Sequence, residues 1–152
     1  MKLTRLLAPA LGATLVAASA GTAMAAPDGP QRLRGMDDRS FDVVVTGGEA
    51  LGLPESFPNC YTFEADGTWI DPQFPDADNP VPGTWEQHRV GATTGYSASA
   101  SAFGGVVTLE QSGRVTPAGG RGVLQLEAVS TVSFGGNVAA TLESVGSEVD
   151  SC

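Results

Sequence analysis

An Asp-Gly turn between two short alternating runs limits what this chain can fold into more than any other feature. Residues 61–64 (YTFE) alternate apolar and polar side chains, and residues 68–70 (TWI) resume the alternation after the turn. Strict alternation is the periodicity of a half-buried strand, and Asp-Gly between two such runs is typical of a β-hairpin. The sequence therefore predicts antiparallel sheet around this turn.

Two loop lengths fit this hairpin, and they differ in which side chains share a face. A two-residue Asp-Gly loop would pair Glu64 with Trp69, whereas a three-residue Ala-Asp-Gly loop would pair Phe63 with Trp69. The second register is favoured because it keeps Tyr61, Phe63 and Trp69 together, and a slip of one residue would separate them. It requires a left-handed conformation at Gly67, where glycine has no Cβ penalty.

Strand-like segments recur along the rest of the chain, separated by turns rich in glycine and proline, and no segment shows sustained helical periodicity. About seven to nine short strands at hairpin spacing predict an all-β fold, an antiparallel up-and-down meander that is closed or nearly closed into a barrel. Closure is favoured because it removes exposed strand edges. A two-layer β-sandwich is the alternative. The expected strands cover residues 41–46, 61–64, 68–70, 83–87, 96–102, 106–111, 124–134 and 138–143.

The first 25 residues have the pattern of an export signal. Lys2 and Arg5 precede an apolar run over residues 6–20, and Ala-Met-Ala follows at 23–25. This order is typical of a signal peptide that is cleaved after Ala25. The apolar run is too short for a membrane span with these flanks. We therefore expect the protein to be exported, to the periplasm or the extracellular medium.

After cleavage the chain is expected to hold a flexible, polar N-terminal arm at 26–40 and a single β-barrel domain at 41–152. Six of the eight basic residues and all 17 acidic residues remain, so the net charge becomes 6 − 17 = −11. A chain this acidic repels nucleic acid and anionic lipid. We expect no nucleic-acid partner and no insertion into a membrane.

The chain has two cysteines, Cys60 at the start of the hairpin and Cys152 at the end of the sequence. An even number of cysteines in an oxidising compartment predicts one disulfide. The bond would anchor the C-terminal segment, since terminal residues otherwise fray. Two separate thiols with the single His88 do not make a zinc-binding set.

No pattern for catalysis is present, so we expect neither an enzyme nor a bound cofactor. His88 is the only histidine, and the sequence lacks the G-x-S-x-G motif of a nucleophile elbow. Asp71, Asp76 and Asp78 lie in a proline-rich loop and make a candidate for a hard cation such as Ca²⁺. The EF-hand spacing is not met, and a solvated acidic loop is the expected alternative.

Five aromatic residues could line the mouth of the predicted barrel, and the alanines at 98, 100 and 102 would leave space beside them. Small barrels either fill with side chains or hold one small ligand. The same aromatic residues could therefore simply form the core. They are Tyr61, Phe63, Trp69, Trp85 and Tyr96.

Residues 63–69 (FEADGTW), followed by GTW at 83–85, resemble the hairpins of lipocalin-like (calycin) barrels. The resemblance implies an up-and-down barrel and assigns no functional residue. The tryptophan that lipocalins carry near their first strand is absent from residues 41–46.

Two functions fit these observations. The first is a non-enzymatic exported barrel that binds a small apolar ligand or stays unliganded. The alternative is a secreted or periplasmic protein-interaction module, such as an inhibitor or an envelope component. Such a module would use the loops at 47–59 and 71–82 as its contact surface.

Overall fold

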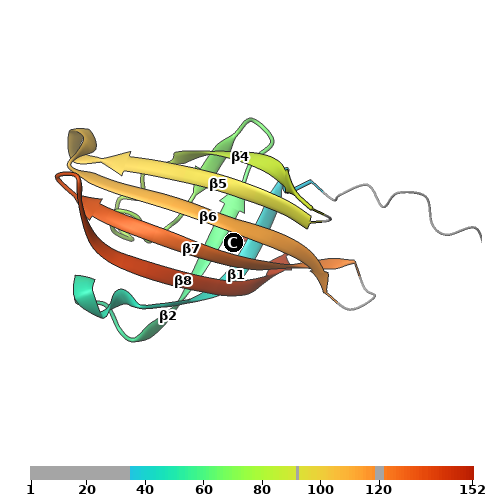
Figure 1. The fold of residues 1–152 in the computed structure, drawn as a ribbon, viewed down its shortest axis with the longest axis horizontal. Helices are drawn as coiled ribbons and strands as arrows, with labels where there is room; N and C mark the ends of the chain where they lie inside the picture. The colour runs from blue at the N-terminus through green and yellow to red at the C-terminus, as the bar shows by residue number, and fades with distance from the viewer. Residues whose placement is uncertain (1–34, 92, 119–121) are drawn as a thin grey trace, which may run out of the picture. The chain divides into compact units, whose positions relative to one another are not determined.

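A computed structural model of the chain describes residues 35–91, 93–118 and 122–152. This part forms a closed barrel of antiparallel strands that follow one another in sequence order (Figure 1). The predicted all-β meander and its closure are confirmed, and the sandwich alternative is excluded. The expected signal peptide at 1–25 lies outside the described residues. The strands are β1 (Arg39–Thr46), β2 (Ser56–Phe63), β3 (Thr68–Ile70), β4 (Gly83–Val90), β5 (Thr93–Ala102), β6 (Val107–Ala118), β7 (Val123–Phe134) and β8 (Asn137–Val149).

The barrel closes where β1 pairs with β8. The ladder runs antiparallel from Ser40 opposite Val149 to Thr46 opposite Glu143. β1 pairs with β2 on its other side, so both of its edges are satisfied. Along β1 the apolar side chains alternate inward, with Phe41, Val43 and Val45 buried. This pattern is the strand periodicity that a barrel interior requires.

The central hairpin adopts the predicted register. Phe63 pairs with Trp69, and both side chains are buried. Gly67 has a positive φ of 89°, and its N–H donates to the Glu64 carbonyl at 3.0 Å. The three-residue loop is therefore confirmed, together with the left-handed glycine that it needs.

One end of the barrel is filled by aromatic side chains. The Phe63 ring makes edge-to-face contacts with Phe41, Trp85 and Tyr96, at centroid distances of 5.8, 5.3 and 4.9 Å. Met36 is fully buried at this end, and its N–H donates to Gln87 Oε1 at 3.2 Å. Edge-to-face pairs are a favoured arrangement of aromatic rings.

The expected flexible arm at 26–40 is too long. β1 begins at Arg39, and Met36 is packed into the core. Arg39 also forms an ion pair with Glu148. An apolar side chain and a paired arginine hold this segment to the barrel, which the polar composition of the segment did not indicate. The part of the arm before residue 35 lies outside the described residues.

The loop expected at 47–59 is also too long, because β2 begins at Ser56. Between the strands lies a short 3-10 helix, η1 (Gly48–Leu51). Pro58 lies inside this strand, where a proline usually removes a ladder hydrogen bond. On the side away from β1, however, β2 pairs with β3 only at Thr62 and Phe63. Glu64 donates its N–H toward the β3 side of β2, to the Thr68 carbonyl. Pro58 lies six residues earlier, so its backbone nitrogen is on the same side of the strand, where no strand pairs with it. The absence of an N–H on Pro58 therefore removes no ladder hydrogen bond.

The sixth strand does not end at Ser112-Gly113 as expected, but continues to Ala118. Gly113 lies opposite Tyr96 on β5 and Ala128 on β7. A Cβ at this position would stand 2.6 Å from Tyr96 Cε1. The glycine is therefore a packing site for the tyrosine ring and not a turn.

The loop expected at 71–82 is present, whereas β4 and β5 extend into the expected connection at 88–95 and β8 continues beyond residue 143 to Val149. Residues 71–82 form a long loop between β3 and β4, stabilised by a hydrogen bond from the Val81 N–H to the Phe74 carbonyl at 2.9 Å. A second short 3-10 helix, η2 (Phe103–Gly105), joins β5 to β6. Within the described ranges, no helix has the length and apolar character to cross a bilayer.

Candidate functional site

The barrel end opposite the aromatic core contains a cavity of about 770 Å³. This end carries η1, η2 and the turn between β7 and β8, and it lies at the left of Figure 1. The apolar lining residues are Val45, Ala50, Leu51, Leu53, Pro54, Phe57, Pro58, Phe74, Pro75, Val107, Leu109, Val132, Phe134, Ala139 and Leu142. The polar lining residues are Asn59, Tyr61, Asp71, Gln73 and Ser130.

The cavity exists because several inward positions at this end carry side chains smaller than an aromatic ring. Val45, Leu109 and Ser130 stand there, whereas the rings of Phe63 and Trp69 fill the other end. The alanines at 98, 100 and 102, which were expected to leave space, are buried but do not line the cavity. The space comes from medium-sized aliphatic side chains and a serine on other strands.

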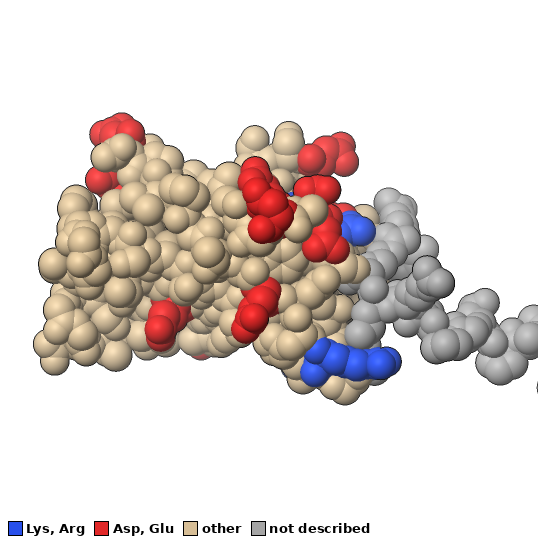
Figure 2. All heavy atoms as spheres, turned by 90° about the horizontal axis from the view of Figure 1, so that it is seen from above, with Lys and Arg blue, Asp and Glu red and all other residues tan. Residues whose placement is uncertain are grey.

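Two loops build the mouth of the cavity. The connection between β1 and β2 contributes Leu51 and Leu53, and the 71–82 loop contributes Phe74. Leu53 and Phe134 at the rim are 41% and 47% exposed, so the cavity reaches the surface. In the view of Figure 2 this end again lies at the left and shows mainly uncharged surface, with acidic side chains at its upper corner. The entrance is therefore largely uncharged, and Leu53 and Phe134 contribute apolar side chains to its rim.

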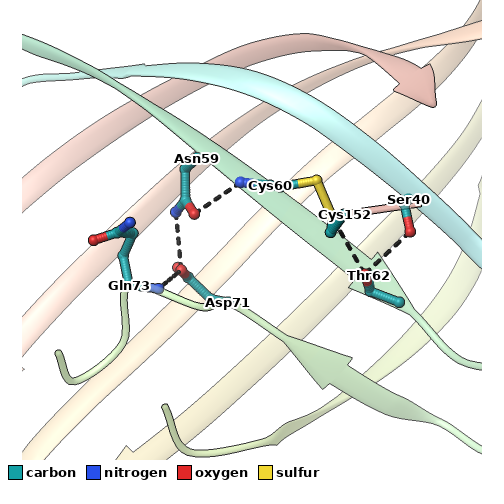
Figure 3. The surroundings of a disulfide bond; sticks show 7 residues. All are labelled: Ser40, Asn59, Cys60, Thr62, Asp71, Gln73 and Cys152. Atoms are coloured by element: carbon teal, nitrogen blue, oxygen red, sulfur yellow. Dashed lines mark hydrogen bonds between the residues drawn. A yellow bond between two sulfur atoms is a disulfide. The ribbon is translucent and has the colours of Figure 1, made fainter. Parts of the chain in front are cut away.

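Asp71 is the charged group of the cavity, and its position is fixed by two donors. Asn59 Nδ2 donates to Asp71 Oδ1 at 2.8 Å, and the Gln73 N–H donates to the same oxygen at 2.9 Å (Figure 3). Asn59 Oδ1 in turn accepts from the Cys60 N–H at 2.8 Å. Asp71 is only 7% exposed, and its Oδ2 accepts no hydrogen bond from the described residues.

Burial dominates the electrostatics of this site. It raises the pKa of Asp71 above the usual carboxyl value, and the hydrogen bonds from Asn59 and Gln73 oppose the shift without cancelling it. Burial, and then the negative charge of Asp71, raises the pKa of the neighbouring Tyr61 to about 12. Tyr61 shares a hydrogen bond of 2.9 Å with Ser144 Oγ. Tyr61 is therefore neutral at physiological pH.

A second series of hydrogen-bonded polar side chains joins the cavity to the aromatic core. The Tyr96 hydroxyl donates to Gln111 Oε1 at 2.7 Å, and Gln111 Nε2 donates to Ser130 Oγ at 2.8 Å. All three side chains are buried, and Ser130 lines the cavity. Burial is the largest cause of the strongly raised pKa of Tyr96. These hydrogen bonds give each of the three buried side chains a partner, as buried polar atoms require.

The structure separates the five aromatic residues that were candidates for lining a ligand site. Tyr61 lines the cavity, whereas Phe63, Trp69, Trp85 and Tyr96 pack in the core beside it. Tyr61 and Trp69 connect the two groups, with ring centroids 5.9 Å apart. Within the described ranges, Trp69 Nε1 is the buried side-chain polar atom that has no hydrogen-bond partner.

The three loop aspartates do not gather around a common point. Asp71 faces the cavity, whereas Asp76 and Asp78 are exposed, and Asp76 Oδ1 accepts from the Asp78 N–H at 3.1 Å. No group of three or more His, Cys, Asp and Glu residues in the described part could hold a metal ion. His88 is an exposed residue of β4. The candidate calcium set is therefore not assembled.

Sequence reasoning missed several polar residues of the interior. Asn59 was assigned to a loop, and Gln111 and Ser144 were not singled out, although all three are buried. The signal was present for Ser130, which interrupts the apolar face that runs from Leu124 to Phe134 in steps of two. A polar residue at an inward position of an alternating strand marks either a buried network or a binding site.

The predicted disulfide is present between Cys60 and Cys152, which are 92 residues apart in sequence. It ties the C-terminal segment to β2 at the residue next to Asn59 (Figure 3). Thr62 Oγ1 also donates to Cys152 Sγ at 3.3 Å. The covalent bond therefore supports the strand that supplies the cavity floor.

The closed antiparallel meander confirms the small-barrel architecture that was expected from the motifs at 63–69 and 83–85. Comparison with known proteins finds no matching family model, no matching curated protein and no matching solved structure.

Proposed function

We propose that this chain is an exported barrel that holds one small, largely apolar molecule in its interior. The observation that carries the proposal is the cavity of about 770 Å³, which has aliphatic and aromatic walls and a small set of fixed polar groups at its floor. Cavities of roughly 300–1,000 Å³ with this mixture of surfaces are typical of small-molecule sites. The apolar wall provides affinity and the polar floor fixes orientation.

The rim supports entry of an apolar ligand. Leu53, Phe103, Val106, Phe134 and Val138 are exposed and belong to the loops and turns at the mouth end of the barrel. The turns of η2 and of β7–β8 are joined by a hydrogen bond from the Gly135 N–H to the Val106 carbonyl at 2.8 Å. An apolar rim lowers the free-energy cost of moving a hydrophobic molecule from another apolar surface into the cavity.

A neutral, polarity-sensitive dye such as Nile red tests the proposal directly. We expect a saturable rise in fluorescence that corresponds to one dye molecule per chain. Ala139→Trp places a large ring in the mouth and should abolish the signal. Ala65→Trp adds the same ring to the exposed β2–β3 turn at the other end and should leave the signal unchanged. A flat titration with the unmodified protein would contradict the proposal.

Export is proposed together with the binding function. The N-terminal pattern supports it, and the disulfide is compatible with it, because such bonds persist in oxidising compartments. N-terminal sequencing of the mature protein from its own host should give Ala26 as the first residue. A mature protein that retains Met1 would contradict export through this signal.

The second candidate function is a protein-interaction module, and the exposed apolar side chains at the mouth end favour it. Phe103 and Val138 are among the most exposed large hydrophobic residues of the described part. The mouth loops at 47–55 and 71–82 would then form the contact surface. Native mass spectrometry of protein purified from its own host separates the two functions. A bound small molecule supports the first, and a bound protein chain supports the second.

A further inference from the structure

We infer that the cavity selects a molecule with a positively charged nitrogen head group, an amphiphilic amine, and that Asp71 Oδ2 receives that head group. The inference rests on the proposed binding function and specifies its ligand class. It follows from the donors and acceptors of the cavity, from its charge, and from the place of Asp71 among the few polar residues that line an otherwise apolar space.

The first observation is the free acceptor. Both donors to Asp71, the Asn59 side chain and the Gln73 backbone, use Oδ1. Asn59 is held in this orientation because its own oxygen accepts from the Cys60 N–H. Among the described residues, Oδ2 has no hydrogen-bond partner, and it belongs to a side chain that lines the cavity in a residue that is more than nine-tenths buried. An ionised carboxylate only accepts hydrogen bonds, so the site requires a donor from the ligand.

The second observation is the charge of the lining. Among the described residues that line the cavity, Asp71 is the charged one, and no Lys, Arg or His is present. A buried carboxylate without a counter-ion is unfavourable, and a cation beside it recovers much of the desolvation cost. A ligand carboxylate would meet a like charge in a poorly solvated site. The cavity therefore disfavours a fatty acid anion, although its walls suit an alkyl chain.

The other titratable group that faces Asp71 does not supply the missing charge. Tyr61 on β2 lies near Asp71 and forms a hydrogen bond with Ser144 on β8, and its pKa of about 12 keeps it neutral. The remaining polar lining groups, Asn59, Gln73 and Ser130, do not titrate. The raised pKa of Asp71 agrees with a carboxyl group that has no cationic partner among the residues that the structure describes.

The apolar walls define the rest of the ligand. Val45, Leu109 and Leu142 from the strands, with Leu51, Phe57 and Phe74 from the mouth, surround the space above the floor. A hydrocarbon body placed against these side chains would direct a terminal ammonium toward Asp71. An ammonium presents up to three donors, which also suits the neutral oxygens of Tyr61 and Ser130.

Three probes with the same decyl chain test the head group: decylamine, decanol and decanoate, each at a concentration where it is monomeric. They are compared by displacement of Nile red at neutral pH. A charge-assisted hydrogen bond in a buried site should make decylamine at least about tenfold tighter than either of the others. Decanol as tight as decylamine, decanoate as the tightest probe, or no displacement by any of them would overturn the inference.

Asp71→Asn and Asp78→Asn form a matched pair, because both remove one negative charge from the same loop. Asp71→Asn should remove most of the preference for decylamine, and Asp78→Asn, at an exposed position, should keep it. A preference that survives Asp71→Asn would show that the general acidity of the surface attracts the amine, and would overturn the role of Asp71. If both variants lose the preference, the assignment to Asp71 is likewise wrong.

The pH dependence gives an independent reading. Decylamine stays protonated below neutral pH, whereas Asp71 becomes neutral as the pH falls through its raised pKa. Its affinity for the unmodified protein should therefore fall on acidification, and its affinity for Asp71→Asn should not. Equal pH dependence in both would contradict the inference. The dye separates this failure from failure of the proposed function, because Nile red would still bind if only the head-group assignment were wrong.

Discussion

At the scale of single residues, Asp71 shows a conflict between stability and the proposed function. The fold raises its pKa, so the folded state favours the neutral carboxyl. Below the pKa that Asp71 has in the unfolded chain, the carboxyl is protonated in both states and its burial as a charge does not lower the free energy of unfolding. As the pH rises through the folded-state pKa, the buried group ionises and stability is lost. Active sites commonly keep such unfavourable groups, because function needs them.

Asp71→Asn should therefore increase the free energy of unfolding at pH 7, with a gain that shrinks toward pH 4. The amide oxygen can still accept from Asn59 and Gln73, so the variant keeps the local hydrogen bonds. Urea unfolding at the two pH values measures the change. Asp78→Asn, at an exposed position, serves as the control and should change stability little at either pH. A loss of stability in Asp71→Asn at pH 7 would contradict this account.

Gly67 is the second residue whose chemistry decides a local structure. Its φ is 89°, and a Cβ there would meet nothing closer than the Trp85 carbonyl oxygen at 3.7 Å. Gly67→Ala should therefore cost about 1 kcal/mol of unfolding free energy through backbone strain alone. Gly67→Asn should cost less, because asparagine tolerates the left-handed region better. Denaturant midpoints for the two variants measure the difference, and an equal cost for both would argue against strain as the cause.

At the scale of elements, β6 shows how a strand can contain a glycine for packing reasons. A Cβ on Gly113 would lie 2.6 Å from both the Glu127 carbonyl oxygen and Tyr96 Cε1, and 2.9 Å from the Ala128 Cβ. Backbone atoms of the neighbouring strand cannot move aside without breaking the ladder. Gly113→Ala should therefore destabilise the barrel by at least about 2 kcal/mol, as overpacking does.

The adjacent Ser112 provides the control for this prediction. It is an exposed residue of the same strand, and Ser112→Ala should stay within about 0.5 kcal/mol of the unmodified protein. Thermal unfolding followed by circular dichroism compares the two variants. If Gly113→Ala and Ser112→Ala change the stability equally little, the packing of the Tyr96 ring does not require a glycine at position 113.

The elements that could be predicted from sequence are those with a local cause. Alternation over residues 61–64 and 68–70, with a glycine that suits a left-handed turn, is sufficient to fix the hairpin and its register. The errors arose where a distant partner decided the outcome. Pro58 lies in a strand because β3 is too short to pair beside it, and Gly113 lies in a strand because Tyr96 fills the space above it.

The candidate site was less predictable than the fold for the same reason. Tyr61 and Asp71 were both candidates, but for separate sites, an aromatic barrel mouth and a calcium loop. Their common cavity depends on where β2 and the 71–82 loop lie after the barrel has closed. Asn59 orients Asp71 across twelve residues of sequence, and no local pattern marks that contact.

At the scale of the whole molecule, the Cys60–Cys152 bond closes most of the barrel into one covalent loop. With a sequence separation of 92 residues, the chain-entropy treatment gives about 4–5 kcal/mol of stabilisation as an upper value. Replacing both cysteines by serine should lower the free energy of unfolding by up to that amount. Urea titrations of the two proteins measure the change. Counting thiols on unreduced, denatured protein should give none, and two reactive thiols per chain would contradict the bond.

The pairing of β1 with β8 also determines when the barrel can form. Ser40 of the first strand is paired with Val149 of the last, so the ladder that closes the barrel joins the parts of the domain made earliest and latest. A growing chain that has reached β7 has open edges on both β1 and β7, and such edges associate with other chains. Consecutive strands can pair as they appear, but the barrel cannot close before β8 is present, so the edges of β1 and β7 stay open to other strands until the last part of the domain has been made.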